Sequence, residues 1–211
     1  TPLYSSAASD VYKRQLLHDR YLDNASDRIE QIDAYSLEEL LSIKTGQNQT
    51  ITTLKKALKQ IDGRCPVNIE LKDTTDNAEG LNEICLQTYL TIQLACEQFN
   101  FSQHDFVVSA FNHLILARLN SLYPEIKTAA LIACCPVDLA VFIQELTVKA
   151  INMDINCINA QTVKDAHNKQ LEVNVYTVDH HQDIALCQKL NVDGVFTNFP
   201  KKTRNHINKK T

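Results

Sequence analysis

Short runs of β-branched residues alternate with longer helical stretches along most of this chain. The expected strands are Val67–Leu71, Phe106–Ser109, Thr128–Ala133, Ile151–Ile158, Val173–Val178 and Gly194–Thr197. The expected helices are Leu54–Ile61, Leu81–Phe99, Leu114–Leu122, Leu139–Leu146, Thr162–Lys169 and Asp183–Leu190, and Ser36 opens another with the spacing of a capping box. This alternation predicts βαβ units and a parallel sheet. Six strands in one row favour a barrel over a small doubly wound sheet.

The size and charge of the chain limit its class. Its 211 residues, 44% of them hydrophobic, suffice for one packed domain. The net charge of -4 gives no general attraction to nucleic acid or to an anionic membrane. No apolar run approaches the roughly 20 residues that span a bilayer, and the start lacks the apolar centre of a signal peptide. The basic segment Lys201–Lys210 is expected to be a solvated tail.

The chain has seven cysteines and no Cys-x-x-Cys pair. Reduced thiols suit the cytoplasm, although a signal peptide upstream of the given residues would change that localisation. Cys134 and Cys135 adjoin an expected strand, and we expect both to be buried as small apolar side chains.

The segment Val67-Asn68-Ile69-Glu70-Leu71-Lys72 carries the strongest local signal for a functional site. Side chains alternate along a strand, so the apolar residues share one face while the polar and charged ones share the other. Burying an ion pair costs several kcal/mol per ion before the mutual attraction offsets it. The two charges lie near the carboxyl end of the strand, the rim where barrel enzymes carry their chemistry. We therefore interpret Glu70 and Lys72 as functional rather than as a structural ion pair.

Two further blocks place polar residues at strand ends. His18 follows Leu16-Leu17 and can exchange protons near neutral pH, although taken alone it reads as a core histidine. Near the C-terminus, Tyr176-Thr177-Val178-Asp179 ends one strand, and Asn198 and Pro200 end the last one. The adjacent pair His180-His181 is read as an exposed helix start rather than a metal site, because neighbouring positions on a helix point apart.

Taken in this order, the blocks resemble the glycerophosphodiester phosphodiesterase family. The matching segments are LLHDRYLDN, VNIELK, VVSAFNHLIL and VNVYTVD…NVDGVFTNFP, which together span Leu16 to Pro200. The resemblance implies an α/β fold, a (β/α)8 TIM barrel of the phosphodiesterase type. It departs at Tyr176, where the family usually has Trp.

The resemblance also implies a role for each matching residue. His18 would be the second of two catalytic histidines, an acid or base for the phosphodiester. Glu70 would be one carboxylate ligand of a divalent metal ion, Ca²⁺ or Mg²⁺, which prefer oxygen donors. Lys72 would neutralise phosphate charge, and Phe111 and Tyr176 would form the wall beside the glycerol or the leaving alcohol.

The start of the chain departs from the family pattern. The family's His-Arg-Gly strand end and its Glu-x-Asp strand do not occur, and residues 1–15 stand in their place. Residues 10–15 resemble translated read-through of a sequencing adaptor, with an ordinary disordered N-terminus as the alternative. We therefore expect a partial barrel over residues 16–200 with open edges at Val67–Leu71 and Gly194–Thr197, a basic tail over residues 201–211, and no activity in the chain by itself.

The expected activity of the complete parent protein is metal-dependent hydrolysis of a small-molecule glycerophosphodiester to glycerol 3-phosphate and an alcohol. Two alternatives stay open. One is a lysophospholipid phosphodiesterase, which a wider substrate mouth would favour. The other is a non-catalytic barrel that binds a phosphorylated ligand.

Overall fold

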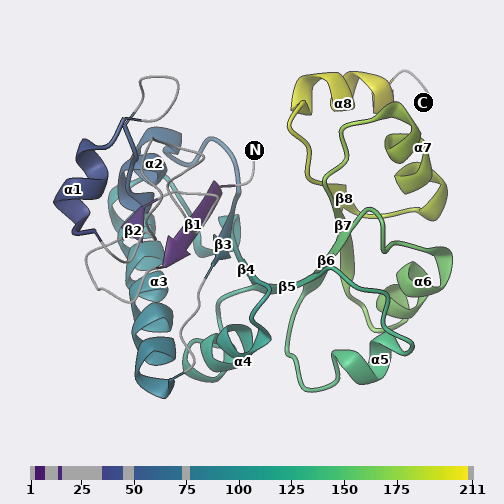
Figure 1. The fold of residues 1–211 in the computed structure, drawn as a ribbon, viewed down its shortest axis with the longest axis horizontal. Coiled ribbons are helices and arrows are strands. Elements are labelled where there is room, and N and C mark those ends of the chain that lie inside the picture. The colour runs from purple at the N-terminus through teal and green to yellow at the C-terminus, as the bar shows by residue number, and fades with distance from the viewer. Residues whose placement is uncertain (1–2, 8–13, 16–34, 45–49, 73–76, 209–211) are drawn as a thin grey trace. The chain divides into compact units, whose positions relative to one another are not determined.

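The computed structural model describes residues 3–7, 14–15, 35–44, 50–72 and 77–208. Within them the chain divides into two compact units, an N-terminal unit over Pro2–Lys127 and a C-terminal unit over Thr128–Thr211. From Val67 onward both units consist of parallel strands that alternate with helices, as the sequence predicts (Figure 1), whereas the first two strands of the N-terminal unit pair antiparallel. None of the helices in the described ranges has the length and apolar character that a membrane crossing needs.

The sheet of the N-terminal unit has the strand order β2-β1-β3-β4. Its strands are β1 (Leu3–Ala7), β2 (Arg14–Gln15), β3 (Val67–Leu71) and β4 (Phe106–Ala110). The middle strand, β3, pairs in parallel with β4 on one side and with β1 on the other. The expectation of an open edge at β3 is therefore wrong, because β1 occupies that edge with Tyr4 opposite Glu70.

The helices of this unit begin where the sequence places caps. They are α1 (Leu37–Ser42), α2 (Leu54–Ile61), α3 (Ala78–Gln98) and α4 (His113–Leu122), with the short 3-10 helix η2 (Gln103–Asp105) before β4. The predicted capping box is confirmed, since Ser36 Oγ accepts from the backbone N–H of Glu39 and the Glu39 carboxylate accepts from the backbone N–H of Ser36.

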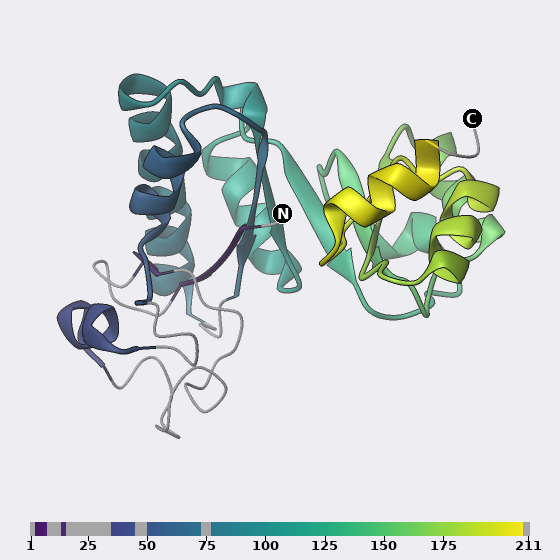
Figure 2. The ribbon, with the colours of Figure 1, turned by 90° about the horizontal axis from the view of Figure 1, so that it is seen from above.

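Packing in the N-terminal unit follows the apolar face of each helix. Helix α2 buries Leu54, Ala57 and Leu58, the spacing of a single helical face. Helix α3 packs against α2 and α4 (Figure 2). The rings of Tyr89 and Tyr123 stack with centroids 4.2 Å apart where α3 meets the end of α4.

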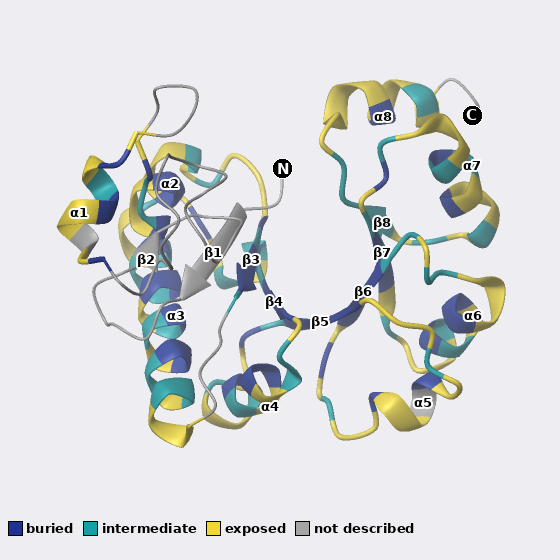
Figure 3. Ribbon diagram, viewed as in Figure 1, coloured by how far each residue is buried: buried dark blue, intermediate teal, exposed yellow. Residues whose placement is uncertain are grey.

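The C-terminal unit repeats a strand and a helix four times, in the strand order β5-β6-β7-β8. Its strands are β5 (Thr128–Ile132), β6 (Ala150–Asp154), β7 (Glu172–Tyr176) and β8 (Gly194–Val195). Its helices are α5 (Leu139–Phe142), α6 (Ala160–Asn168), α7 (His181–Leu190) and α8 (Pro200–Asn208). Strand β6 is mostly buried and β7 buries Val173 and Val175, while the outer faces of α6 and α7 are exposed (Figure 3).

Three expectations for this unit are wrong. Strand β6 ends at Asp154 rather than Ile158, because the Asp154 carboxylate accepts from the backbone N–H of Asn156 and starts a turn. Cys134 and Cys135 are exposed, because β5 ends before them. The basic segment is a packed helix as far as Asn208, with Thr203 buried against the unit.

The turn after α2 requires glycine at position 63. Gly63 has a φ of +68°, in the left-handed region, and a Cβ there would overlap the backbone carbonyl of Asn100. The Asp62 carboxylate also accepts hydrogen bonds from the backbone and side chain of Asn100. These contacts join the loops that lead into β3 and β4, at the end of the strands opposite the rim.

We expect Gly63→Ala to destabilise the fold by about 2–4 kcal/mol, because the strained φ and the backbone overlap both oppose a methyl group. For a chain of this size, that lowers Tm by roughly 5–15 °C. Gly80→Ala in α3 is the control, since alanine suits a right-handed helix. A thermal melt of Gly63→Ala that matches the unsubstituted chain would contradict this account of the turn.

Candidate active site

The carboxyl end of β3 holds the charged pair that the sequence predicts. Glu70 is 4% exposed, and Lys72 Nζ lies 3.5 Å from its Oε1. The lysine side chain keeps 26% exposure, so its ammonium group can meet a ligand from solvent while the carboxylate stays buried. The alternating pattern is confirmed, because Val67, Ile69 and Leu71 are buried on the other face of the strand.

A polar contact beside this pair joins β3 to β4. Asn68 Nδ2 donates to Ser109 Oγ at 3.0 Å, and Ser109 lies opposite Glu70 in the strand register. Ser109 is fully buried, so the hydrogen bond satisfies a polar group inside the fold.

Phe111 leaves the sheet at the same edge as Lys72. It follows Ala110, which pairs with Leu71, and it is 50% exposed. A large apolar ring left half in solvent at a strand end suits a wall for a bound molecule. The structure thus brings Glu70, Lys72 and Phe111 together at one edge of the N-terminal unit.

The predicted residue of the C-terminal unit, Tyr176, is the last residue of β7. Its hydroxyl donates to the backbone carbonyl of Ile132 at 3.1 Å, which holds the ring over the end of β5. The peptide bond between Tyr176 and Thr177 is cis. His18, the predicted acid or base, lies outside the described residues.

Asp179 organises the loops that follow β7 and β8. Its carboxylate accepts from Thr197 Oγ1 at 2.9 Å, from the backbone N–H of Asn198 at 2.8 Å, and from Asn198 Nδ2 at 2.7 Å. Burial alone would raise the pKa of Asp179, but the hydrogen bonds from Asn198 and Thr197 favour the charged form, and the net pKa is lowered.

We expect Asp179→Ala to destabilise the fold by about 1–3 kcal/mol at neutral pH, because three donors lose their acceptor. A carboxyl group whose pKa is lowered on folding stabilises the folded state at any pH above its pKa in the unfolded chain. That stabilisation is lost as the pH falls through its pKa in the folded state. The difference in urea midpoint between the variant and the unsubstituted chain should therefore shrink as the pH is lowered below 3.8, the ordinary pKa of an aspartate. Glu172→Ala, at the other end of β7, is the control, and a difference that persists in acid would count against this role.

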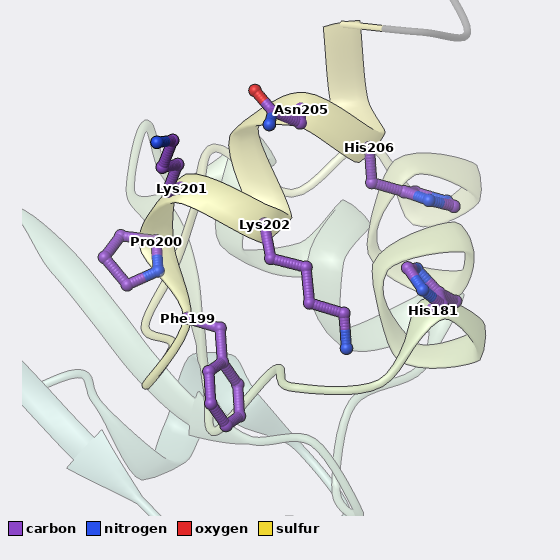
Figure 4. A pocket seen from close by; sticks show the side chains of 7 residues that line it. All are labelled: His181, Phe199, Pro200, Lys201, Lys202, Asn205 and His206. Atoms are coloured by element: carbon purple, nitrogen blue, oxygen red, sulfur yellow. The ribbon is translucent and has the colours of Figure 1, made fainter.

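A pocket of about 610 Å³ opens between α7 and α8 (Figure 4). Phe199, just past the end of β8, is 52% exposed, and Lys202 Nζ lies 5.6 Å from the centre of its ring. The imidazoles of His181 and His206 face each other with centroids 4.5 Å apart. The lining residues are His181, Phe199, Pro200, Lys201, Lys202, Asn205 and His206.

Two polar contacts of the C-terminal unit were not predicted from the sequence. Asn174 Nδ2 donates to Asn152 Oδ1 at 3.1 Å between β7 and β6, and each amide alternates with buried apolar residues as Glu70 does. The alternation that identified Glu70 would have identified both. Asp179 gave no such signal, because its partners lie 18 and 19 residues further along the chain.

A divalent metal ion at this edge of the sheet would need oxygen ligands. Glu70 offers the carboxylate oxygens that hard cations prefer, and it is held in a buried position beside the ammonium group of Lys72. However, no group of three or more His, Cys, Asp or Glu side chains that could hold an ion occurs in the described part of the chain. The described residues therefore supply one suitable ligand and do not themselves form a complete site.

Comparison with known proteins identifies the family. The sequence profile of the Glycerophosphoryl diester phosphodiesterase family matches residues 15–202. YqiK of Bacillus subtilis is 29% identical over 138 residues, which cover 64% of this chain but only 54% of YqiK. A glycerophosphodiester phosphodiesterase of Bacillus altitudinis is 25% identical over 201 residues, covering 89% of this chain and 78% of the relative.

Solved structures show the same fold. A phosphodiesterase of Oleispira antarctica, in complex with the product sn-glycerol-3-phosphate, matches with a TM-score of 0.84 and 22% identity, covering 98% of this chain and 84% of its own. Glycerophosphodiester phosphodiesterase of Agrobacterium tumefaciens matches with a TM-score of 0.69 and 16% identity, covering 93% and 82%. The predicted incomplete α/β barrel of the phosphodiesterase type is thereby confirmed. The chain belongs to the Glycerophosphoryl diester phosphodiesterase family.

Proposed function

We propose that the complete parent protein hydrolyses glycerophosphodiesters to sn-glycerol 3-phosphate and an alcohol such as choline or ethanolamine. One observation carries the proposal, the buried Glu70 paired with Lys72 at the carboxyl end of β3 in a chain of this family. The product complex of the related Oleispira antarctica enzyme supports the same class of substrate.

Each residue of the proposed site has a distinct task. Lys72, with its ammonium group partly exposed, neutralises phosphate charge, and Glu70 keeps that ammonium group oriented. Phe111 of the N-terminal unit and Tyr176 of the C-terminal unit are each proposed to contact the glycerol or the leaving alcohol. His18 exchanges a proton with the attacking or the leaving oxygen.

Glu70 is also proposed as one ligand of a divalent cation, Ca²⁺ or Mg²⁺. Such an ion, when bound, supplies charge neutralisation for the phosphodiester and lowers the pKa of bound water. The family resemblance assigns two further carboxylates to a strand with a Glu-x-Asp triplet, and no Glu-x-Asp triplet occurs from residue 16 onward in this sequence. The chain by itself is therefore proposed to be inactive.

The test compares two proteins. One consists of residues 16–211 joined to the upstream segment of the Bacillus altitudinis relative and is named the completed chain, and the other is the 211-residue chain as it stands. We expect the completed chain to release glycerol 3-phosphate from glycerophosphocholine and glycerophosphoethanolamine, and the 211-residue chain to release none. Release of a lysophosphatidic acid from lysophosphatidylcholine as the preferred reaction would favour the lysophospholipid enzyme. Binding of glycerol 3-phosphate without turnover would favour the non-catalytic barrel.

A further inference from the structure

Three cysteines gather where two neighbouring strands of the C-terminal unit end. Cys134 and Cys135 follow β5, and Cys157 follows β6, which pairs with β5 in parallel (Figure 1). Cys134 and Cys135 are exposed, Cys157 is half-buried, and all three are free thiols. An oxidant in solution can therefore reach the group.

Cys135 is the member of the adjacent pair that contacts Cys157. Its Sγ donates to the backbone carbonyl of Cys157 at 3.4 Å. A disulfide needs the sulfur atoms to approach to about 2.05 Å. Since the Cys135 sulfur already contacts the Cys157 backbone, we expect side-chain rotation to bring the two sulfur atoms together with little movement of the backbone.

Asp154 holds Cys157 in place. Its carboxylate accepts from the backbone N–H and the side-chain amide of Asn156, each at 2.8 Å, and its backbone carbonyl accepts from the N–H of Cys157 at 2.9 Å. The turn is therefore fixed by three hydrogen bonds, and the thiol of Cys157 is presented to the loop after β5.

We propose that Cys135 and Cys157 form a reversible disulfide when the protein meets a peroxide, and that this bond links the loop after β5 to the loop after β6. The described residues show no group of three His, Cys, Asp or Glu side chains that could hold a metal ion. Covalent thiol chemistry is thus the use that this arrangement supports.

The reaction balances with hydrogen peroxide as the oxidant. The Cys135 thiolate attacks one peroxide oxygen, the O–O bond breaks, and hydroxide takes up the thiol proton as water, which leaves a sulfenic acid on Cys135. The Cys157 sulfur then attacks the Cys135 sulfur, the S–O bond breaks, and the hydroxyl group leaves as water with the Cys157 proton. Two thiols lose two electrons, and one peroxide becomes two waters.

The order of these steps follows from the surroundings of the two thiols. Burial raises the pKa of Cys157, and the hydrogen bond with the Cys135 side chain and the nearby charges of Cys135, Asp154 and Cys134 raise it further. A thiol with a raised pKa is a poor first nucleophile towards peroxide. The exposed Cys135 is therefore oxidised first, and Cys157 completes the disulfide.

The experiment treats the intact chain with hydrogen peroxide, blocks the remaining thiols, and maps disulfide-linked peptides by mass spectrometry. We expect a Cys135–Cys157 peptide, a loss of two of the seven free thiols per chain, and full recovery after dithiothreitol. Cys134→Ser is the matched control, exposed and in the same loop, and it should keep the link. Cys135→Ser and Cys157→Ser should lose it.

A trapping reaction tests the order of the steps. In Cys157→Ser the sulfenic acid has no partner, so dimedone labelling of Cys135 should rise well above that of the unsubstituted chain. The same oxidation in urea should yield mixed pairings, because the fold no longer selects the partner. A link through Cys134, or a native chain whose pairing matches the urea sample, would overturn the proposal.

Discussion

Glu70→Gln in the completed chain is expected to lower kcat for glycerophosphocholine by at least about 10², the loss typical when one group that stabilises transition-state charge is removed. Glutamine preserves the shape of the side chain but removes the negative charge. Lys72 then loses the carboxylate 3.5 Å from its Nζ, and the proposed metal site exchanges a charged carboxylate for a neutral amide.

Calorimetric titration with Ca²⁺ and Mg²⁺ gives a measurement independent of turnover. We expect weaker binding of the ion by Glu70→Gln and a cooperative melt close to that of the unsubstituted protein. Glu97→Gln, which changes an exposed carboxylate on α3, is the control and should alter neither measurement. Unchanged affinity for both ions would remove Glu70 from the metal site, and a lost melt would show that its role is structural.

His18→Ala in the completed chain is expected to lower kcat by roughly 10²–10⁴, the contribution typical of a general acid or base. The loss should be smaller for a substrate with a nitrophenol leaving group, if His18 protonates the leaving oxygen. An equal loss for both leaving groups would instead assign His18 to the attacking oxygen.

The control for this substitution is His104→Ala, since His104 is exposed in η2 at the amino end of β4. It should retain full activity on glycerophosphocholine and on the nitrophenyl substrate. Full activity of His18→Ala on glycerophosphocholine would end the assignment of His18 as a catalytic residue.

The elements predicted most accurately are those whose signals are local. Helix α2 and strand β3 have the predicted bounds, because buried residues at helical spacing mark the first and strict alternation marks the second. The predicted strand Ile151–Ile158 was too long, because its apolar residues continue into a turn that the Asp154 side chain imposes.

The same distinction applies to the site. Glu70 lies within one short strand and Lys72 directly follows it, so their alternation with apolar residues was visible in the sequence. The contact of Cys135 with Cys157 and the network around Asp179 depend on loops brought together by the fold. No local pattern encodes such contacts, and only the pairing of β5 with β6 and of β7 with β8 creates them.

The amides of β6 and β7 have a consequence for how these strands align. Asn152 lies opposite Asn174, and Asn174 lies opposite Gly194 on β8, where a Cβ would overlap its side-chain oxygen. A slip of one residue would turn each amide towards the helices and set a larger side chain against Asn174. Two amides and one glycine thus favour a single register of the three strands over the registers shifted by one residue.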